Sequence, residues 1–153
     1  MKPTLIALLA LFLSLPLVAA DKDKPLPKDF KSIKALAEKG NAKAQYNLGV
    51  MYRKGQGVEQ DFKEAVKWYQ KAADQGYATA QYNLGVMYGE GSGVLQDDVT
   101  AYAWWDISAA NGQEKARIFK GLAAKELTAE EIDKAEDLVK EMVKKNPKLL
   151  NKE

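Results

Sequence analysis

The chain has 153 residues, of which 46% are hydrophobic and 29% are charged, a composition typical of a single folded domain. Its 23 Lys and Arg residues nearly balance 21 Asp and Glu residues, which argues against the broad basic surface of a nucleic-acid-binding protein. The sequence has no cysteine and no histidine, so it lacks a thiol nucleophile and the commonest general base and metal ligand. We therefore expect no enzyme, no metal site and no cofactor.

The first twenty residues have the pattern of a secretory signal peptide. Lys2 precedes an unbroken apolar run at residues 5–13, and Pro16 and the small residues 18–20 follow. The run is shorter than the roughly 20 apolar residues of a membrane span. We expect cleavage after Ala20 and a periplasmic or secreted protein without membrane insertion, while an uncleaved N-terminal anchor is the alternative.

After a charged, proline-containing stretch at 21–29, which we expect to be a flexible lead-in, the chain repeats itself. Residues 44–52 (AQYNLGVMY) recur letter for letter at residues 80–88, an offset of 36 residues. Further identities at the same offset include a Gly-x-Gly-Val loop, an aspartate and a tryptophan. A fixed period of this length indicates a helical solenoid.

The first helix expected in each repeat carries Ala44, Leu48 and Tyr52 at helical spacing, which predicts a buried stripe. Gly49 lies on that stripe and costs about 1 kcal/mol of helix propensity. We expect this glycine to allow close approach of the neighbouring helix.

The second helix of each repeat is expected to begin after an aspartate N-cap, Asp61 in the first copy and Asp97 in the second. Trp68 and Trp104 occupy the same repeat position and are predicted to be core residues. Glycines at 76 and 112 then close these helices.

The flanking segments extend the pattern. Residues 30–43 read as a truncated half-repeat, and residues 116–124 are in register with a first helix, although Lys120 replaces the core leucine. Thr128 and Glu131 predict a capping box at the start of a final helix that would close the solenoid.

The predicted organisation is therefore a signal peptide (1–20), a lead-in (21–29), a repeat domain (30–146) and a tail (147–153). Within the repeat domain, the half-repeat at 30–43 precedes two repeats, 44–79 and 80–115, and a degenerate helix with its cap, 116–146.

The 36-residue unit resembles the Sel1-like repeat, a relative of the tetratricopeptide repeat. The residues of the first copy that carry the resemblance are Ala44, Leu48, Gly49, Tyr52, Gly55, Gly57, Val58, Asp61, Ala65, Trp68, Ala72, Ala73 and Gly76. In the second copy, Ser108 departs from the pattern at the position of Ala72. The resemblance implies an all-α fold, a short right-handed α-solenoid of helix–turn–helix repeats with a C-terminal capping helix. It also implies an adaptor or scaffold surface that binds another protein.

Register with tetratricopeptide solenoids predicts that the first helices line a concave groove for a peptide or helix of the partner. The side chains expected to face this groove are Tyr46, Asn47, Val50 and Arg53 in the first repeat and Tyr82, Asn83, Val86 and Glu90 in the second. Packing between repeats is an equal alternative for Tyr46 and Tyr82. Trp105 stands where the first repeat has Tyr69, roughly 100° around the helix from Trp104, and is predicted to be the more exposed indole.

The leading hypothesis is a non-catalytic protein-interaction module of the bacterial cell envelope. The alternatives are a cell-wall glycan- or peptide-binding or enzymatic role that uses Trp105 and the tyrosines, and a structural subunit of an envelope complex. Two full repeats give a small groove, which a homodimer would extend.

Overall fold

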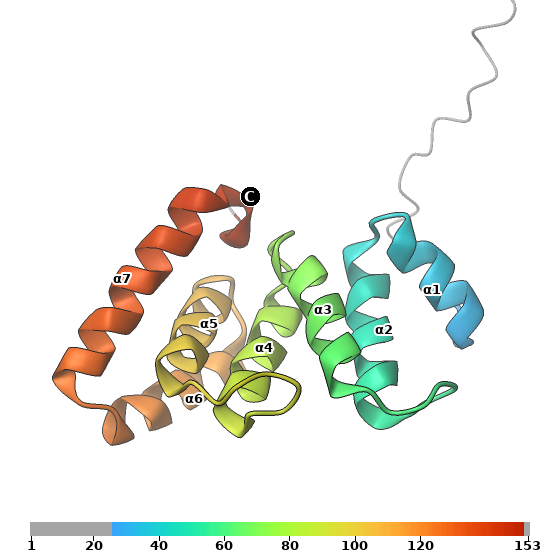
Figure 1. Cartoon of the computed structure of the whole chain (residues 1–153). Helices are drawn as coiled ribbons and strands as arrows, with labels where there is room; N and C mark the ends of the chain where they lie inside the picture. Colours follow the sequence, from blue (N-terminus) through green and yellow to red (C-terminus); the bar gives the residue numbers. More distant parts are fainter. Residues whose placement is uncertain (1–25, 152–153) are drawn as a thin grey trace, which may run out of the picture.

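The computed structural model describes residues 26–151, which form a row of consecutively packed helices and contain no strand (Figure 1). The helices are α1 (Phe30–Glu38), α2 (Ala42–Lys54), α3 (Phe62–Ala73), α4 (Ala78–Glu90), α5 (Asp98–Ala110), α6 (Glu114–Glu126), α7 (Ala129–Lys145) and the 3-10 helix η1 (Pro147–Leu149). The all-α repeat solenoid predicted from the sequence is confirmed. The expected signal peptide and residues 21–25 of the expected lead-in lie outside the described residues.

Polar side chains start the helices where the sequence predicts. Asp61 and Asp97 each accept a hydrogen bond from the backbone N–H three residues later, both at 3.0 Å. Thr128 and Glu131 form the predicted capping box at the first turn of α7. These caps satisfy backbone donors that the helix itself leaves free.

The first helix of each repeat ends at a glycine in the left-handed region. Gly55 has φ +65° and Gly91 has φ +66°, a conformation that a side chain disfavours. Each glycine opens a loop that leads to the aspartate cap of the next helix. The loops therefore have the same length in both repeats.

Packing joins neighbours in chain order: α2 with α3 and α4 with α5 within the repeats, and α3 with α4 between them. Leu48 and Leu84 are fully buried in this stack. Trp68 and Trp104 are 9% and 4% exposed, so their predicted place in the core is confirmed.

An aromatic ring that lies on a glycine joins the two helices of each repeat. Tyr69 of α3 lies against Gly49 of α2, where an added Cβ would come within 2.6 Å of the ring. Trp105 of α5 lies against Gly85 of α4, where an added Cβ would be 2.3 Å from the indole Nε1. The glycines thus allow a close contact with the neighbouring helix as predicted, but the contact is made mainly by an aromatic side chain of that helix, which the repeat pattern does not predict.

The sequence predicts Trp105 to be the more exposed indole, and at 9% it does exceed Trp104 at 4%, but it is as buried as Trp68 and is not an exposed ring. The reason lies in the surroundings of α5, which α4, α6 and α7 all contact. A position 100° away from the core stripe therefore still points into the protein. The ring of Phe119 on α6 covers the indole, with the two ring centroids 5.4 Å apart.

Buried glutamines, which sequence reasoning missed, connect each repeat to the preceding one. Gln45 and Gln81 are 5% and 0% exposed, and each donates a 3.1 Å hydrogen bond to a backbone carbonyl at the end of the preceding helix. Gln81 also donates to the carbonyl of Leu149 at 2.8 Å. The signal was present as the invariant Gln in the nine-residue repeated block.

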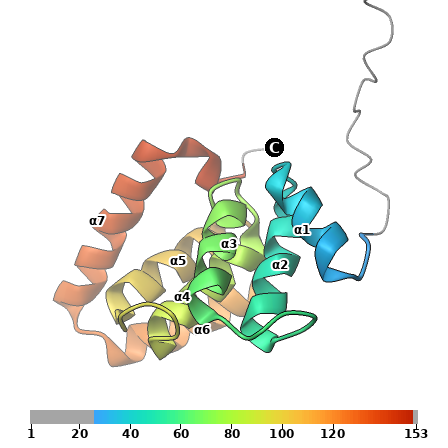
Figure 2. The same ribbon diagram turned by 45° about the vertical axis from the view of Figure 1, so that its right-hand side comes forward.

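The C-terminal segment returns over the middle of the solenoid. Helix α7 packs against α5, and the chain after it comes back towards α3 and α4 in the middle of the row (Figure 1 and Figure 2). Leu149 is 3% exposed and joins the main core, and the side chain of Asn111 donates to its carbonyl at 2.7 Å. Asn146 donates to the carbonyl of Asp74 at 2.9 Å. Residues 147–151, which the sequence leaves in a tail, are thus docked on the repeats.

Gly85→Ala should destabilise the protein by about 1–3 kcal/mol, because the new methyl group overlaps the indole of Trp105. Gly121 holds the same repeat position in α6, and nothing lies within 4 Å of a Cβ built there. Gly121→Ala is therefore the matched control, and it should stabilise the protein by up to about 1 kcal/mol through helix propensity. Urea unfolding followed by circular dichroism measures both, and equal effects would contradict the ring-on-glycine packing.

Leu149→Ala should lower the free energy of unfolding by about 2–5 kcal/mol, because it empties a place in the main core. Lys148→Ala, at the exposed neighbouring position, should stay within about 0.5 kcal/mol of the original chain. Thermal unfolding of the two variants side by side checks this, and identical midpoints would mean that the C-terminal segment adds no stability.

Candidate partner-binding site

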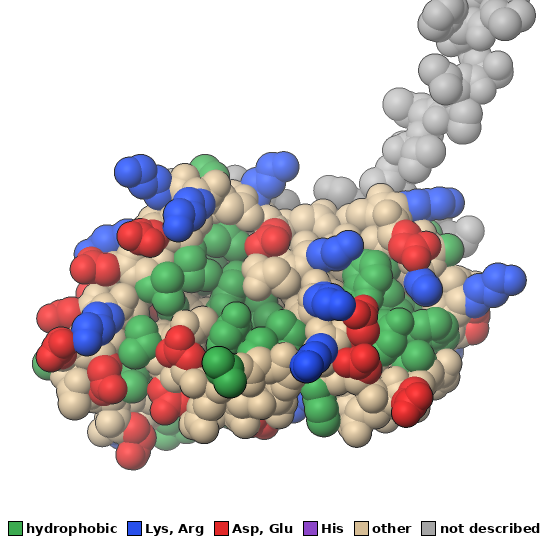
Figure 3. Space-filling model, in the orientation of Figure 1, with side chains coloured by type: hydrophobic (Ala, Val, Ile, Leu, Met, Phe, Trp, Pro, Cys, Tyr) green, Lys and Arg blue, Asp and Glu red, His purple; other side chains and the backbone are tan. Residues whose placement is uncertain are grey.

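The residues predicted to line a groove lie on three helices. Tyr46, Asn47, Val50 and Arg53 are on α2, Tyr82, Asn83, Val86 and Glu90 are on α4, and Trp105 is on α5. Most are half-buried, and they differ in what they contact. On the face of the molecule shown in Figure 3, acidic and basic side chains are interspersed, with apolar side chains between them.

The two repeated tyrosines are engaged in packing between helices. The ring of Tyr46 lies 5.4 Å from that of Tyr77 and 6.0 Å from that of Tyr69, measured between centroids. Tyr82 meets Phe119 edge to face at 5.4 Å, and partial burial raises its pKa. These contacts favour the packing alternative for both tyrosines.

The other α2 and α4 positions differ in what they offer a partner. Asn47 is half-buried and Asn83 is 8% exposed, and within residues 26–151 neither amide has a protein hydrogen-bond partner, so both could bind one. Val50 packs against the main core. Arg53 forms an ion pair with Glu90 at 3.6 Å, which joins α2 to α4.

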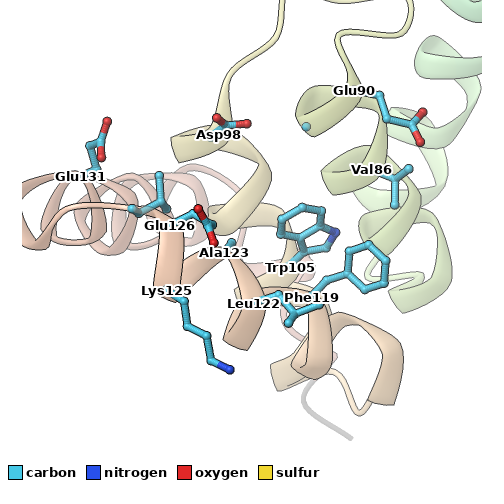
Figure 4. Close-up of a pocket in the computed structure, with 12 residues that line it drawn as sticks. Val86, Glu90, Asp98, Trp105, Phe119, Leu122, Ala123, Lys125, Glu126 and Glu131 are labelled. Carbon is cyan, nitrogen blue, oxygen red and sulfur yellow. The ribbon is translucent and has the colours of Figure 1, made fainter.

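Next to the predicted residues of α4, a cavity of about 550 Å³ lies between α4, α5, α6 and the start of α7 (Figure 4). Its apolar lining includes Val86, Trp105, Phe119 and Leu122. The structure thus brings three of the nine predicted residues (Val86, Glu90 and Trp105) to one cavity and leaves the other six outside its lining.

The second repeat can form this cavity because of one substitution between the copies. Gly89 stands at the position that Arg53 occupies in the first repeat. A Cβ on Gly89 would come within 3.4 Å of the Trp105 ring, so a long side chain there would cover the indole. The absence of a side chain at this point leaves the cavity open.

Helix α6 supplies the most accessible apolar side chains of the site. Phe119 and Leu122 are 37% and 52% exposed, and Ile118 beside them is 55% exposed. Sequence reasoning missed them, although they follow Tyr82, Asn83 and Val86 at the same offset of 36 residues. The repeat register itself was the signal that identifies them as groove positions.

Lys120, at the position of the core leucine, joins α6 to α5 by an ion pair, in addition to the apolar contact of the buried Ala116. Its ammonium group lies 2.6 Å from the carboxylate of Asp106 and 5.4 Å from the ring centroid of Tyr102. Partial burial lowers the pKa of Lys120, but the hydrogen bond and charge of Asp106 outweigh this and raise it overall. The lysine is therefore held as a cation, and α6 can turn its apolar side chains outward.

Trp105 has a polar atom that the protein does not satisfy. Its Nε1 is buried and, within the described residues, has no hydrogen-bond acceptor. The hydroxyl of Tyr69, at the equivalent position, is also buried without a partner, and burial raises its pKa. The aromatic-on-glycine packing is therefore maintained at some cost in polar desolvation.

Residues 26–151 include no group of three or more acidic side chains arranged to hold a metal ion. No helix in the same range is long and apolar enough to cross a membrane.

The chain resembles known repeat proteins in both sequence and structure. Residues 42–77 and 78–113 each match the Sel1 repeat model. A protective antigen of uropathogenic Escherichia coli strains, which displays an SLR fold, aligns with 79% of this chain at 35% identity and a TM-score of 0.74. The aligned part is 26% of that protein, so this chain spans about a quarter of its length.

A second solved structure aligns over much of its own length. A Sel1 repeat protein from Oxalobacter formigenes is 41% identical over 60% of this chain and 68% of that one, with a TM-score of 0.58. Among curated proteins, none matches the chain.

Proposed function

The chain belongs to the Sel1 repeat family, and from that premise we propose that it is a non-catalytic module of the cell envelope that holds an apolar side chain of a partner protein in the α4–α6 cavity. Sel1 repeats are generally protein-interaction modules, and their fold is typically a non-catalytic scaffold. The partner segment proposed here is an extended peptide or a helix.

The observation that carries this proposal is the exposed apolar surface of the cavity. Phe119 and Leu122 remain accessible beside the indole of Trp105, although a helical repeat normally covers such residues with its next helix. A volume of about 550 Å³ falls within the range of small-ligand pockets and admits one or two side chains. Apolar surface gathered at one concave place is characteristic of interaction sites.

A glycan-binding role has less support. A sugar site normally offers an accessible aromatic face, and Trp105, the ring proposed for that role, is 9% exposed. An enzymatic role also has less support, because the chain lacks histidine and cysteine, two common catalytic side chains, and would have to rely on its carboxylates. Protein binding needs no more than accessible apolar surface with a polar rim.

We also propose export to the periplasm or the medium. The support comes from the sequence alone, in which a basic residue, an apolar run and small residues follow one another over residues 1–20. Without cysteine, the exported protein needs no oxidative folding, and its stability comes from helix packing.

Phage-displayed random peptides, selected on the chain from Asp21 onward, test the binding proposal. Leu122→Gln should weaken the binding of the selected peptides about five- to thirtyfold, because the lost apolar contact is worth roughly 1–2 kcal/mol. Leu95→Gln is the matched control, since Leu95 is 90% exposed and lies outside the cavity lining.

Fluorescence anisotropy with labelled peptides gives the affinities. Peptides that bind both variants equally well would place the binding surface elsewhere, and a selection without binders would count against a peptide-binding function.

The export proposal has its own test. Intact-mass analysis of the periplasmic fraction should show a protein that begins at Asp21 or within a few residues of it. A full-length product that stays in the membrane fraction would support the uncleaved anchor instead.

A further inference from the structure

We propose that the α4–α6 cavity selects a partner segment in which a lysine or arginine stands beside the apolar anchor. This rests on the proposed function and names the chemistry of the partner for the same cavity. Around the apolar lining stand four carboxylates, those of Glu90, Asp98, Glu126 and Glu131, against one cation, Lys125. The chain as a whole carries a net charge of +2, so this acidic rim is a local feature.

Two of the four carboxylates already have close partners, and Asp98 accepts a long hydrogen bond of 3.5 Å from the neutral amide of Gln96. Glu90 forms an ion pair with Arg53, and Glu131 accepts hydrogen bonds from Thr128 in the capping box. Within residues 26–151, no cation lies within ion-pairing distance of Asp98 or Glu126. These two carboxylates are therefore the groups with charge to offer a ligand.

The positions of the side chains agree with this assignment. In Figure 4, Asp98, Glu126 and Lys125 all lie to the left of the Trp105 indole, and the Lys125 side chain extends downward, away from Asp98. A cation next to the bound apolar group would thus meet two unpaired carboxylates at the edge of a low-dielectric surface. Such complementarity favours a basic partner and disfavours an acidic one.

The rim also argues against a second copy of this chain as the occupant. Leu95, 90% exposed, is the most accessible large apolar side chain that a copy could insert. It is followed closely by Asp97 and Asp98, so its insertion would bring two further carboxylates against the acidic rim. Like charges brought together in this way oppose binding.

The test starts from the peptides selected on the chain. We expect them to carry Lys or Arg within one helical turn of an apolar residue. In the tightest binder, replacing Lys by norleucine or Arg by citrulline, which removes the charge and keeps the aliphatic part of the side chain, should weaken binding about two- to fivefold. The loss should shrink at high salt, because the charges are screened.

Protein variants give the reciprocal measurement. Asp98→Asn combined with Glu126→Gln should weaken the binding of the basic peptide by a similar factor. The affinity for the neutral peptide, which carries norleucine or citrulline, should not change. Glu59→Gln combined with Asp133→Asn changes the net charge equally at exposed positions outside the cavity lining, and it should affect neither peptide.

Two results would overturn the charge preference and leave the binding proposal standing. One is a set of peptides whose affinity depends on Leu122 but is indifferent to their own charge or to the Asp98 and Glu126 changes. The other is a selection dominated by acidic peptides. A separate outcome is a dimer in analytical ultracentrifugation that Leu122→Gln converts to a monomer, which would overturn the charge preference in favour of self-association. Peptide binding that does not depend on Leu122 at all would count against the proposed function itself.

Discussion

The repeats depend on one contact, an aromatic ring of the second helix lying on a glycine of the first. Tyr69 covers Gly49 and Trp105 covers Gly85, each at a distance that excludes a Cβ. Gly121 repeats the position in α6, but no side chain of another helix lies within 4 Å of a Cβ built there. The solenoid therefore ends where the glycine is kept and its ring is missing. The apolar side chains beside that glycine stay exposed, and they form the candidate site.

The short connection after α6 explains why no aromatic ring covers Gly121. Residues 91–97 join α4 to α5 through a loop with two left-handed glycines, whereas Leu127 and Thr128 alone join α6 to α7. With so short a link, the capping box starts α7 at once, and α7 packs on α5 instead of completing a repeat with α6. The end of the repeat pattern and the opening of the cavity thus have a common physical cause.

The sequence predicts the local features of this fold well, because repeat period, caps and left-handed glycines are properties of short segments. It predicts long-range ones poorly. Trp105 was misplaced because a helical-wheel angle assumes one buried face, whereas α5 has neighbours on three sides. The hydrogen bond from Gln81 to the carbonyl of Leu149 joins residues 68 positions apart, and no periodic pattern in the sequence predicts it. Three of the nine predicted site residues line the cavity. The repeat register identifies which face of a helix points towards the groove, but it does not show which part of that face the next helix leaves uncovered.

A site of this kind limits how the protein can bind. Where the second repeat has Gly89, the first has Arg53, whose ion pair with Glu90 joins α2 to α4, so we place the apolar anchor position in the cavity of the second repeat. One buried anchor side chain contributes about 1.5–3 kcal/mol, well short of the roughly 8 kcal/mol of a micromolar complex. The remaining affinity must come from the polar rim and from the partner's contacts along α4 and α6. Beside a large hydrophobic interface the carboxylates of Asp98 and Glu126 would add little. Here, where a single apolar anchor contributes little affinity and little selectivity, they contribute a larger share of both.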